Sequence, residues 1–386
     1  MYQRFDRSAQ PAAWRPNLAV AAPPYAPLAL PRRYPLITHV EGTIPFLKNT
    51  TSNPLRVDPS GLLGGLLLTF VGTTTTTATA PVPTNASPYA IISRVTLSTG
   101  GGVGKTIDLS AYELDVAERT READYVDDPV VVTTASGARA LSFCVFIPVC
   151  VRLGDLYGEW TDLLGAIFTG DPQVTCNVTL TFADEFAIFS NQTAAVGVIA
   201  GTITVTSFKY DVPNPDRDAM LLGAISWIHQ IIEERSDLGP VQMPYLMPTN
   251  EPRVYLRIWN IYSEQAAAPQ NAATYKNGVQ TLWDLNLQDY LHFFENVPEA
   301  AILEMQLRRY NIALPPGTYC ADFAASQYRT QWLPVERVSL FKNAPTFTAP
   351  GTGALNRVMQ ESLVPSPLAR KWIASGVAAG ISLQAA

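Results

Sequence analysis

Residues 89–114 read YAIISRVTLSTGGGVGKTIDLSAYEL, and this stretch contains two signals that favour different folds. Within it, Ile91, Val95 and Leu97 alternate with polar residues, which is the period-two pattern of a strand with one buried face. The run STGGGVGKT at 98–106 follows this strand and ends in Gly-Lys-Thr, as a phosphate-binding loop does. The stretch therefore predicts either a glycine-rich turn in a β fold or a nucleotide-binding loop.

Three features of the sequence argue against the nucleotide-binding loop. Thr99 occupies the position of the first glycine in G-x-x-x-x-G-K-[ST]. The helix should begin inside such a loop, whereas Ser110 and Glu113 form a capping box that starts it several residues later. The acidic pair at 184–185 follows an alternating strand, unlike the fully buried parallel strand that precedes a metal-binding acid. We therefore interpret residues 98–106 as a turn between antiparallel strands.

Period-two alternation recurs across the first half of the chain. The segments are HVEGTIPF at 39–46, LSFCVFIPV at 141–149 and VTLTFAD at 178–184, with a β-prone threonine run at 73–77. Two helices are predicted between these strands, one after Ser110 and an amphipathic one around residues 160–168. This region therefore predicts a strand-rich unit with inserted helices.

A second run of the same style follows a proline-rich bridge, DVPNPDRD, at 211–218. Its predicted strands are SWIHQIIEE at 226–234, VYLRIWNIY at 254–262, GTYCADF at 317–323 and VERVSLF at 335–341. A helix is predicted from Pro298 to Tyr310, because proline suits the first helical position. Two strand-rich units of similar order indicate a duplicated β architecture.

Both ends of the chain differ in composition from the rest. Residues 1–33 are rich in proline and are predicted to be a basic N-terminal arm, and the sequence from 346 to 386 is predicted to be a C-terminal arm. Arginine with tryptophan suits a polar–apolar boundary such as a membrane surface with anionic headgroups. The candidate contact residues are Arg4, Arg7, Trp14, Arg15, Arg32 and Arg33, with Arg370, Lys371 and Trp372 at the other end.

Composition excludes several classes of protein. The chain has 27 Lys plus Arg against 33 Asp plus Glu, a net charge of −6, and charged residues are only 16% of it. This balance argues against a disordered chain and a generic nucleic-acid binder, and no sequence-specific nucleic-acid contact is expected. The apolar runs at 61–72 and 372–383 are shorter than the about 20 residues of a spanning helix. The N-terminus has no secretory signal, so we expect synthesis in a cytoplasm.

The sequence offers no positive sign of catalysis or metal binding. The 4 cysteines lack the spacing of a zinc site, so we expect buried or half-buried free thiols and no metal or cofactor. No G-x-S-x-G or H-E-x-x-H signature occurs. His39 lies beside Glu41, but a general base also needs a positioned nucleophile or substrate, and we expect a structural histidine. We therefore predict that the protein is not an enzyme.

The order of these pieces resembles the double jelly-roll major capsid proteins of tectiviruses and related icosahedral viruses with an internal membrane. The resemblance runs from about Tyr34 to Lys342. YPLITHVEGTIPF is similar to the family's entry into the first jelly roll, and residues 89–114 to the strand, turn and segment that follow. IPVCVRLGDLYGEWTDLLGAIF and VTCNVTLTFADEFAIF are similar to its strand, inserted helix and next strand. RRYNIALPPGTYCADF at 308–323 is similar to the end of the second jelly roll.

The resemblance implies an all-β chain of two eight-stranded jelly-roll barrels side by side, with inserted helices. The domains would be an N-terminal arm at 1–33, a first jelly roll at 34–212, a second at 213–345 and a C-terminal arm at 346–386. Three chains would form a pseudo-hexameric capsomer, and capsomers would tile an icosahedral virion shell around a membrane and genome. The expected partners are two further copies, neighbouring capsomers, penton and minor capsid proteins, and the internal membrane through the N-terminal arm.

Two other interpretations stay open at this point. A jelly-roll spike that binds a receptor or carbohydrate would concentrate aromatic residues at loop tips, and the sequence does not place Trp259, Trp283 or Trp332. A nucleotide hydrolase would lose nucleotide binding when Lys105 is replaced by alanine. Fold and function are separable, so each interpretation needs its own evidence.

Overall fold

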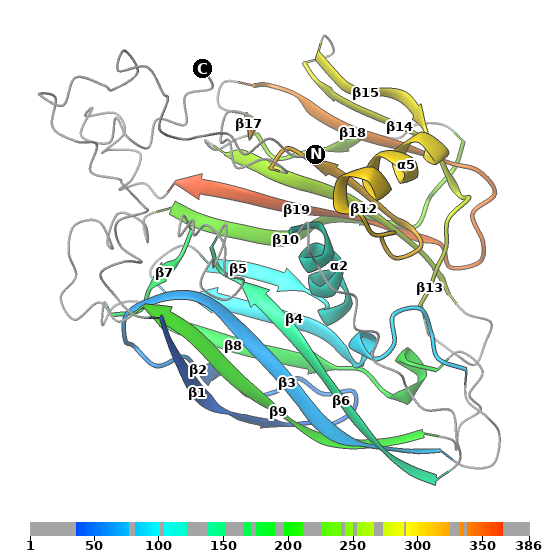
Figure 1. Ribbon diagram of the computed structural model, residues 1–386. Coiled ribbons are helices and arrows are strands. Elements are labelled where there is room, and N and C mark those ends of the chain that lie inside the picture. Colours follow the sequence, from blue (N-terminus) through cyan, green and yellow to red (C-terminus); the bar gives the residue numbers. More distant parts are fainter. Residues whose placement is uncertain are drawn as a thin grey trace, which may run out of the picture.

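Strands make up most of the described chain and gather in two units, one above the other in Figure 1. The computed structural model describes residues 36–76, 82–100, 104–121, 137–150, 165–170, 175–189, 197–210, 225–240, 244–249, 253–265, 273–288, 291–324, 332–335 and 338–365.

The lower unit is formed by the first half of the chain. One antiparallel sheet has the order β1 (Leu36–Pro45), β9 (Gly197–Tyr210), β3 (Leu62–Thr76) and β6 (Gly137–Pro148), with short β7 (Ile167–Phe168) beside β3. The other strands follow the order β2 (Leu55–Arg56), β8 (Cys176–Phe182), β4 (Ile92–Thr99) and β5 (Gly104–Leu109). With β7 left aside and the strands numbered in chain order, the two orders are first-eighth-third-sixth and second-seventh-fourth-fifth. This is the strand order of a jelly roll.

The upper unit repeats this order with the second half of the chain. One set is β10 (Ile225–Arg235), β19 (Leu355–Pro365), β12 (Val254–Gln265) and β16 (Thr318–Asp322). The other set is β11 (Tyr245–Leu246), β18 (Phe341–Phe347), β14 (Gln280–Leu287) and β15 (Leu291–Pro298). Two short strands, β13 (Ala273–Tyr275) and β17 (Leu333–Pro334), add to β12. The predicted duplication is confirmed at the level of strand order.

Among the described residues, each jelly roll has one α-helix, at the same place between its fifth and sixth strands. These helices are α2 (Ala111–Arg121) and α5 (Glu299–Tyr310), and short 3-10 helices η4 (Tyr89–Ile91) and η5 (Glu185–Ala187) flank strands of the first jelly roll. In Figure 1, α2 lies between the two jelly rolls and α5 lies beside the upper one. The position of α2 makes it the central element of the junction described below.

Alternation of apolar side chains explains the cores. In β8 every second residue of CNVTLTF is buried, and in β3 Leu66, Leu68 and Phe70 face the interior of the first jelly roll. A second large cluster, with Trp283 and Phe341 at its centre, fills the second jelly roll. Full burial of each such apolar side chain stabilises the fold by about 1.5–3 kcal/mol.

The glycine-rich segment joins two antiparallel strands, as predicted. β4 and β5 are antiparallel partners with Thr99 opposite Gly104, and residues 101–103 between them lie outside the described residues. The helix α2 begins at Ala111, well beyond the turn, so the segment lacks the strand-loop-helix geometry of a phosphate-binding loop. The capping box is confirmed, because the Ser110 and Glu113 side chains bond each other's backbone N–H at 3.2 and 2.7 Å.

The predicted C-terminal arm from residue 346 is wrong for its first twenty residues. Leu355–Pro365 form β19, which pairs with both β10 and β12 in the middle of a sheet. This strand is buried on both faces and carries polar residues such as Glu361, so its sequence lacks the alternation of a half-buried strand. Residues 366–386 lie outside the described residues.

Four smaller predictions are also corrected. The described end of the expected helix at 160–168 is a strand, because Ile167 and Phe168 pair with β3. In VERVSLF, only Phe341 belongs to a strand among the described residues, since β18 runs on through FKNAPTF. Pro298 is the N-cap of α5 rather than its first helical residue.

Cys144 is exposed, because its neighbours in β6 take the inward positions, while the other three cysteines are buried. The proline-rich bridge and the division at 212/213 fall within residues 211–224, outside the described residues, so the division stays a prediction.

Candidate functional site: the junction between the two jelly rolls

The residues predicted from the sequence to contact a membrane lie outside the described part of the chain. They are Arg4, Arg7, Trp14, Arg15, Arg32, Arg33, Arg370, Lys371 and Trp372. Their contact with a membrane therefore stays a prediction. Among the described residues, no helix has both the length and the apolar character needed to cross a bilayer. The feature that distinguishes the described chain is the junction between its two halves.

The junction begins with a pair of strands from different jelly rolls. β5 and β10 are parallel neighbours, with Ile107 opposite His229 and Asp108 opposite Gln230. This pairing fuses four strands of the first jelly roll with the central strands of the second into one sheet of ten strands. Because backbone hydrogen bonds cross the boundary, the two jelly rolls are not independent domains joined by a linker.

The helix α2 fills the space beside this strand pair. Most of its residues are buried, including the charged side chains of Glu113 and Asp115. Tyr112 lies 4.3 Å, between ring centroids, from Tyr275 of β13. The same cluster contains Trp259 of β12 and Met359 of β19. The helix of the first jelly roll therefore packs on the outer face of the second.

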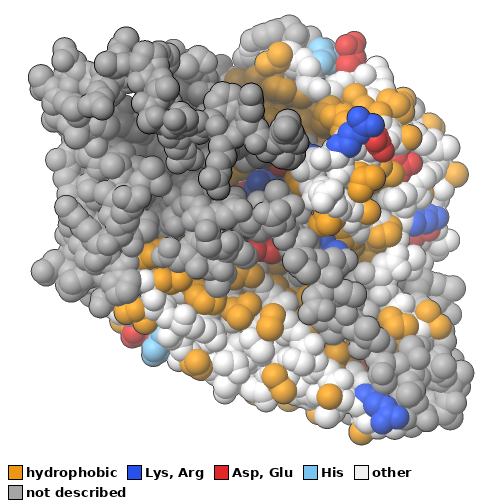
Figure 2. Space-filling model, in the orientation of Figure 1, with side chains coloured by type: hydrophobic (Ala, Val, Ile, Leu, Met, Phe, Trp, Pro, Cys, Tyr) orange, Lys and Arg blue, Asp and Glu red, His pale blue; other side chains and the backbone are white. Residues whose placement is uncertain are grey.

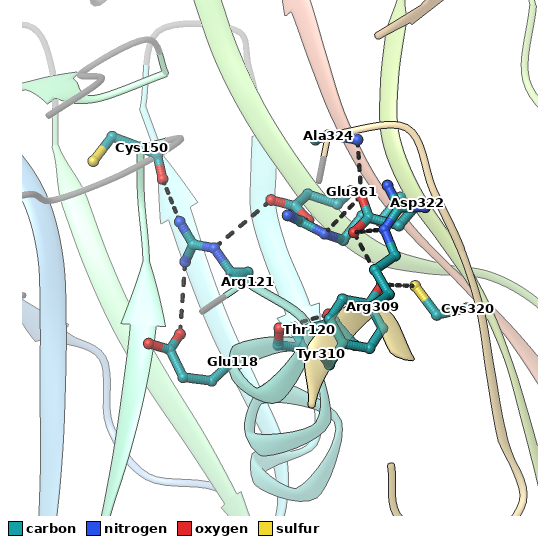
Figure 3. A network of polar contacts seen from close by, with 12 residues as sticks. Glu118, Thr120, Arg121, Cys150, Arg309, Tyr310, Cys320, Asp322, Ala324 and Glu361 are labelled. Carbon is teal, nitrogen blue, oxygen red and sulfur yellow. Dashed lines mark hydrogen bonds and ion pairs between the residues drawn. The ribbon is translucent and has the colours of Figure 1, made fainter. Parts of the chain in front are cut away.

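A buried ion network lies at the end of α2 (Figure 3). Arg257 of β12 contacts Glu361 of β19 at 2.8 Å and Asp322 of β16 at 3.2 Å. All three side chains are buried. Burial opposes the charge of Arg257, but the adjacent carboxylates of Asp322 and Glu361 overcome this effect and raise its pKa above the ordinary value. Arg257 is therefore a fixed positive charge between two strands.

Both helices contribute to this network. Arg121, at the end of α2, donates to the carbonyl of Cys150 at 2.8 Å and lies 3.9 Å from Glu361, as Figure 3 shows. At the end of α5, the Tyr310 hydroxyl donates to Asp322 at 2.9 Å. Burial and the nearby Cys320 and Asp322 raise the pKa of Tyr310, which keeps its proton available for that bond.

The charges of the network balance. Arg121, Arg257 and Arg309 face Glu118, Asp322 and Glu361, at distances between 2.8 and 3.9 Å. A buried pair stabilises only when each charge keeps its partner, and removal of one partner costs about 3–5 kcal/mol. The network therefore holds α2, α5 and the central strands in one relative position.

A polar cleft of about 350 Å³ opens beside α2, between β4, β5 and β10. Its charged lining consists of Arg94, Asp108, Glu113, Glu234 and Arg357. Arg94 donates to Asp108 at 2.7 Å, and Arg357 contacts Glu234 at 2.8 Å and Glu113 at 3.2 Å. The lining has two arginines and three carboxylates, so one negative charge is in excess, but each of these side chains contacts one of opposite charge. The cleft therefore resembles a structural seam between the jelly rolls more than a ligand site.

His39 is the candidate general base from the sequence, and the groups around it have structural roles. The Glu41 carboxylate lies 2.6 Å from Lys209 and 3.4 Å from His39, and it accepts a hydrogen bond from Ser207. Burial raises the pKa of Glu41, but the hydrogen bonds from Lys209 and Ser207 outweigh it and lower the pKa below its ordinary value. Within the described ranges, no group of three His, Cys, Asp or Glu side chains could hold a metal ion.

Sequence reasoning missed this junction, although two signals in the sequence point to it. The capping box at Ser110 was recognised, but it did not reveal that the helix is buried on nearly all sides. Arg257 lies in the middle of the apolar strand VYLRIWNIY. A charged residue there requires a buried partner, because an isolated buried charge is very costly. That partner, Glu361, lies in the segment predicted to be an arm.

Comparisons with known proteins agree with this architecture. No family model matches the chain, and no curated protein matches it. A crystal structure of the STIV MCP is 13% identical and covers 87% of this chain and 98% of that one, with a TM-score of 0.62. A structure of Sulfolobus turreted icosahedral virus is 14% identical and covers 89% and 95%, with a TM-score of 0.64. The major capsid protein of bacteriophage PM2 is 10% identical and covers 86% and 97%, with a TM-score of 0.53.

These likenesses extend over nearly the whole of both chains, so the two jelly rolls are matched together in each case. At such low identity the likeness shows the fold. This chain therefore has the all-β double jelly-roll fold, as the sequence resemblance implied.

Proposed function

We propose that this protein is a major capsid protein that forms the shell of an icosahedral virus with an internal membrane. The observation that carries the proposal is the fusion of two jelly rolls of equal strand order through one buried junction. Solved structures with this fold are described as major capsid proteins, of STIV and of bacteriophage PM2. A closed shell is built from repeated contacts between identical chains, and a rigid block presents the same contact surfaces in every copy.

The junction suits this role mechanically. The parallel pair β5–β10 and the ion network around Arg257 fix one jelly roll relative to the other. Three such chains present six similar units, which gives a capsomer with a pseudo-hexagonal outline. The further partners in this proposal are neighbouring capsomers, penton proteins and minor capsid proteins.

The proposal includes a membrane contact through the N-terminal arm. Arginine near a membrane with anionic lipids contributes about 1 kcal/mol per residue, so the five arginines of residues 1–33 are sufficient for a weak attachment. A chain that begins at Tyr34 is the direct test. We expect it to form capsomers but to lose co-flotation with anionic vesicles. Unchanged co-flotation would contradict the membrane role of the arm.

We propose a structural rather than an enzymatic role. Glu41, the carboxylate nearest His39, contacts Lys209 and Ser207, and each charged side chain of the cleft beside α2 contacts one of opposite charge. The glycine-rich segment lies between antiparallel strands, which removes the support for a nucleotide hydrolase. No observation favours the spike or carbohydrate-binding alternative, since Trp259, Trp283 and Trp332 are all buried.

Electron microscopy of the purified protein tests the proposal. We expect particles with six lobes around a pseudo-sixfold axis and, at high protein concentration, patches of hexagonal lattice or closed shells. Separate two-lobed particles at every concentration would contradict a capsid role. Glycan and nucleotide binding would then be the assays that distinguish the alternatives.

A further inference from the structure

The turn between β13 and β14 contains the one Asn-Gly pair of the sequence, Asn277 and Gly278. Such a pair suits a tight turn, and Gly278 has a φ of 84°, which glycine adopts without strain. Both residues are exposed. Asparagine before glycine is also chemically labile, because glycine has no side chain to obstruct attack by its backbone nitrogen. The turn is therefore a candidate site of deamidation.

Deamidation at this turn would proceed in two steps. The backbone nitrogen of Gly278 attacks Cγ of Asn277, and the new N–C bond closes an imide ring. The side-chain amide group leaves as ammonia and takes with it the proton of the Gly278 N–H. Water then opens the ring at either carbonyl and gives aspartate or isoaspartate. The first step therefore requires that the Gly278 N–H and the Asn277 side chain are both free.

Neither group is free in the folded chain. The Gly278 N–H donates to Oε1 of Glu299, the first residue of α5, at 2.7 Å. Oδ1 of Asn277 accepts a hydrogen bond from the Gly317 N–H, also at 2.7 Å. The nitrogen of an imide carries no hydrogen, so ring closure would break the bond to Glu299. The Glu299 carboxylate also opposes loss of the amide proton, since the amide anion would be a second negative charge beside it.

The two groups that hold the pair are themselves fixed. The Tyr319 hydroxyl of β16 donates to the same oxygen of Glu299 at 2.6 Å. Gly317 has a φ of 75°, and a Cβ added to it would collide with the carbonyl oxygen of Tyr262. In Figure 1, α5 and β13 lie at the same side of the upper unit. The acceptor and the donor are therefore positioned by the helix and by the close packing before β16.

The residues on either side of the pair are anchored as well. The Lys276 side chain contacts Glu264 of β12 at 2.7 Å. The carbonyl of Val279 accepts a hydrogen bond from the Thr348 N–H at 2.8 Å. Each of the four residues between β13 and β14 is thus tied to a different part of the chain. Ring closure would require several of these contacts to break together.

We propose that Glu299 protects Asn277 from deamidation, and that Asn277 becomes a modification site when this end of the second jelly roll opens. Isoaspartate would add a carbon atom to the main chain between β13 and β14. Either product would add a carboxylate to a turn that already contacts Glu264 and Glu299. The inference concerns the chemistry of this turn and goes beyond the proposed capsid function.

Glu299→Ala tests the protection in the intact chain. Mass spectrometry of the peptide that contains residue 277 measures the acid formed during incubation at neutral pH. Deamidation of the folded wild type should be slower than that of the same chain unfolded in urea. Glu299→Ala should accelerate it about 10- to 100-fold, the effect on a rate of losing one hydrogen bond to a charged group. Circular dichroism checks that each variant folds.

Glu299→Gln separates loss of the hydrogen bond from a general loosening of the turn. Glutamine keeps the shape of the side chain and an acceptor oxygen, and a neutral hydrogen bond is about half as strong as a charged one. Its rate should therefore lie between those of the wild type and Glu299→Ala. Glu304→Ala is the matched control on the same helix, and its rate should equal that of the wild type. Glu304 pairs with Arg308 at 2.6 Å, and Figure 2 shows a blue and red pair beside orange side chains over this helix.

Three results would contradict the inference. Equal rates for the folded and unfolded wild type would show that the fold does not protect Asn277. A wild-type rate in either Glu299 variant would show that the bond to Gly278 gives no protection. Slower variants would show that Glu299 promotes ring closure as a base. If Glu299→Ala does not fold, Glu299→Gln decides alone. The capsid proposal is tested separately by the particle images, so either can fail without the other.

Discussion

Arg257 on β12 and Glu361 on β19 form an ion pair of 2.8 Å at the interior of the junction, where both side chains are buried. Asp322 contacts the same guanidinium group, and Arg121 reaches the same glutamate from the first jelly roll. The pair thus connects two adjacent strands of the second jelly roll to the helix that inserts from the first.

Replacing Arg257 by methionine should destabilise the chain strongly. The change leaves Asp322 and Glu361 buried beside each other without their guanidinium partner, at a cost of about 3–5 kcal/mol. The shift of the urea unfolding midpoint measures this loss. Arg308→Met is the matched control, because its pair with Glu304 is exposed and such pairs contribute about 0–1 kcal/mol. Equal shifts for both variants would contradict the role of the buried network.

Removing the cap of α2 should have a smaller effect. Ser110→Ala deletes the side-chain acceptor for the Glu113 N–H, and loss of such a cap costs about 0.5–2 kcal/mol. Urea unfolding of Ser110→Ala and of Thr352→Ala, at an exposed turn position, gives the comparison. We expect a change within about 0.5 kcal/mol for the control. An unchanged midpoint for Ser110→Ala would show that packing alone holds α2.

The Glu41–Lys209 pair should make stability depend on acid pH. The pKa of Glu41 is lower in the folded chain than the ordinary 4.5, so the carboxylate stabilises the fold fully above that value. This contribution is lost as the pH falls from 4.5 through the folded-state pKa.

Glu41→Gln is the variant that measures this effect. At pH 7 it should lower the urea midpoint, since hydrogen bonds to a charged group contribute about 1.5–3 kcal/mol. At pH 3 the difference from the wild type should shrink. Glu304→Gln, at an exposed pair, should show little difference at either pH. A difference for Glu41→Gln that does not shrink in acid would contradict the assigned pKa shift.

The cysteines should react in two classes. Cys144 is exposed on the outer face of β6, whereas Cys150, Cys176 and Cys320 are buried. Burial raises the pKa of Cys176 to about 12, which further suppresses its thiolate. In the native protein, a thiol reagent should label Cys144 rapidly and the other three cysteines only in denaturant. Rapid labelling of several thiols in the native protein would contradict the described packing.

Alternation allowed the first jelly roll to be predicted well. In VTLTFAD and LSFCVFIPV the apolar positions keep one parity, because one face of each strand is buried and the other is not. β19 was missed for the opposite reason. Both its faces are buried, one against the core and one against α2, and it carries two buried polar residues. Glu361 belongs to the ion network, and Gln360 accepts a hydrogen bond from Arg253. A strand buried on both faces shows no alternation.

Two local errors have related causes. The periodicity at 160–168 fitted a helix, but Ile167 and Phe168 pair with Leu63 and Leu62 of β3, so tertiary pairing overrode the pattern. β18 contains Asn343 and Pro345, and because asparagine and proline are rare in strands, the sequence of this segment is typical of a loop. Asn343 accepts a 2.6 Å bond from the Trp283 indole in the core, and β11 pairs with residues 342 and 343 without reaching Pro345. Such polar partners become visible only when both strands are in place.

The native mass of the purified wild-type chain tests the central claim most directly. Light scattering over a dilution series should give a species near three times 42.0 kDa that persists on dilution, as the capsomer requires. A stable species of 42.0 kDa at every concentration would contradict the capsid account.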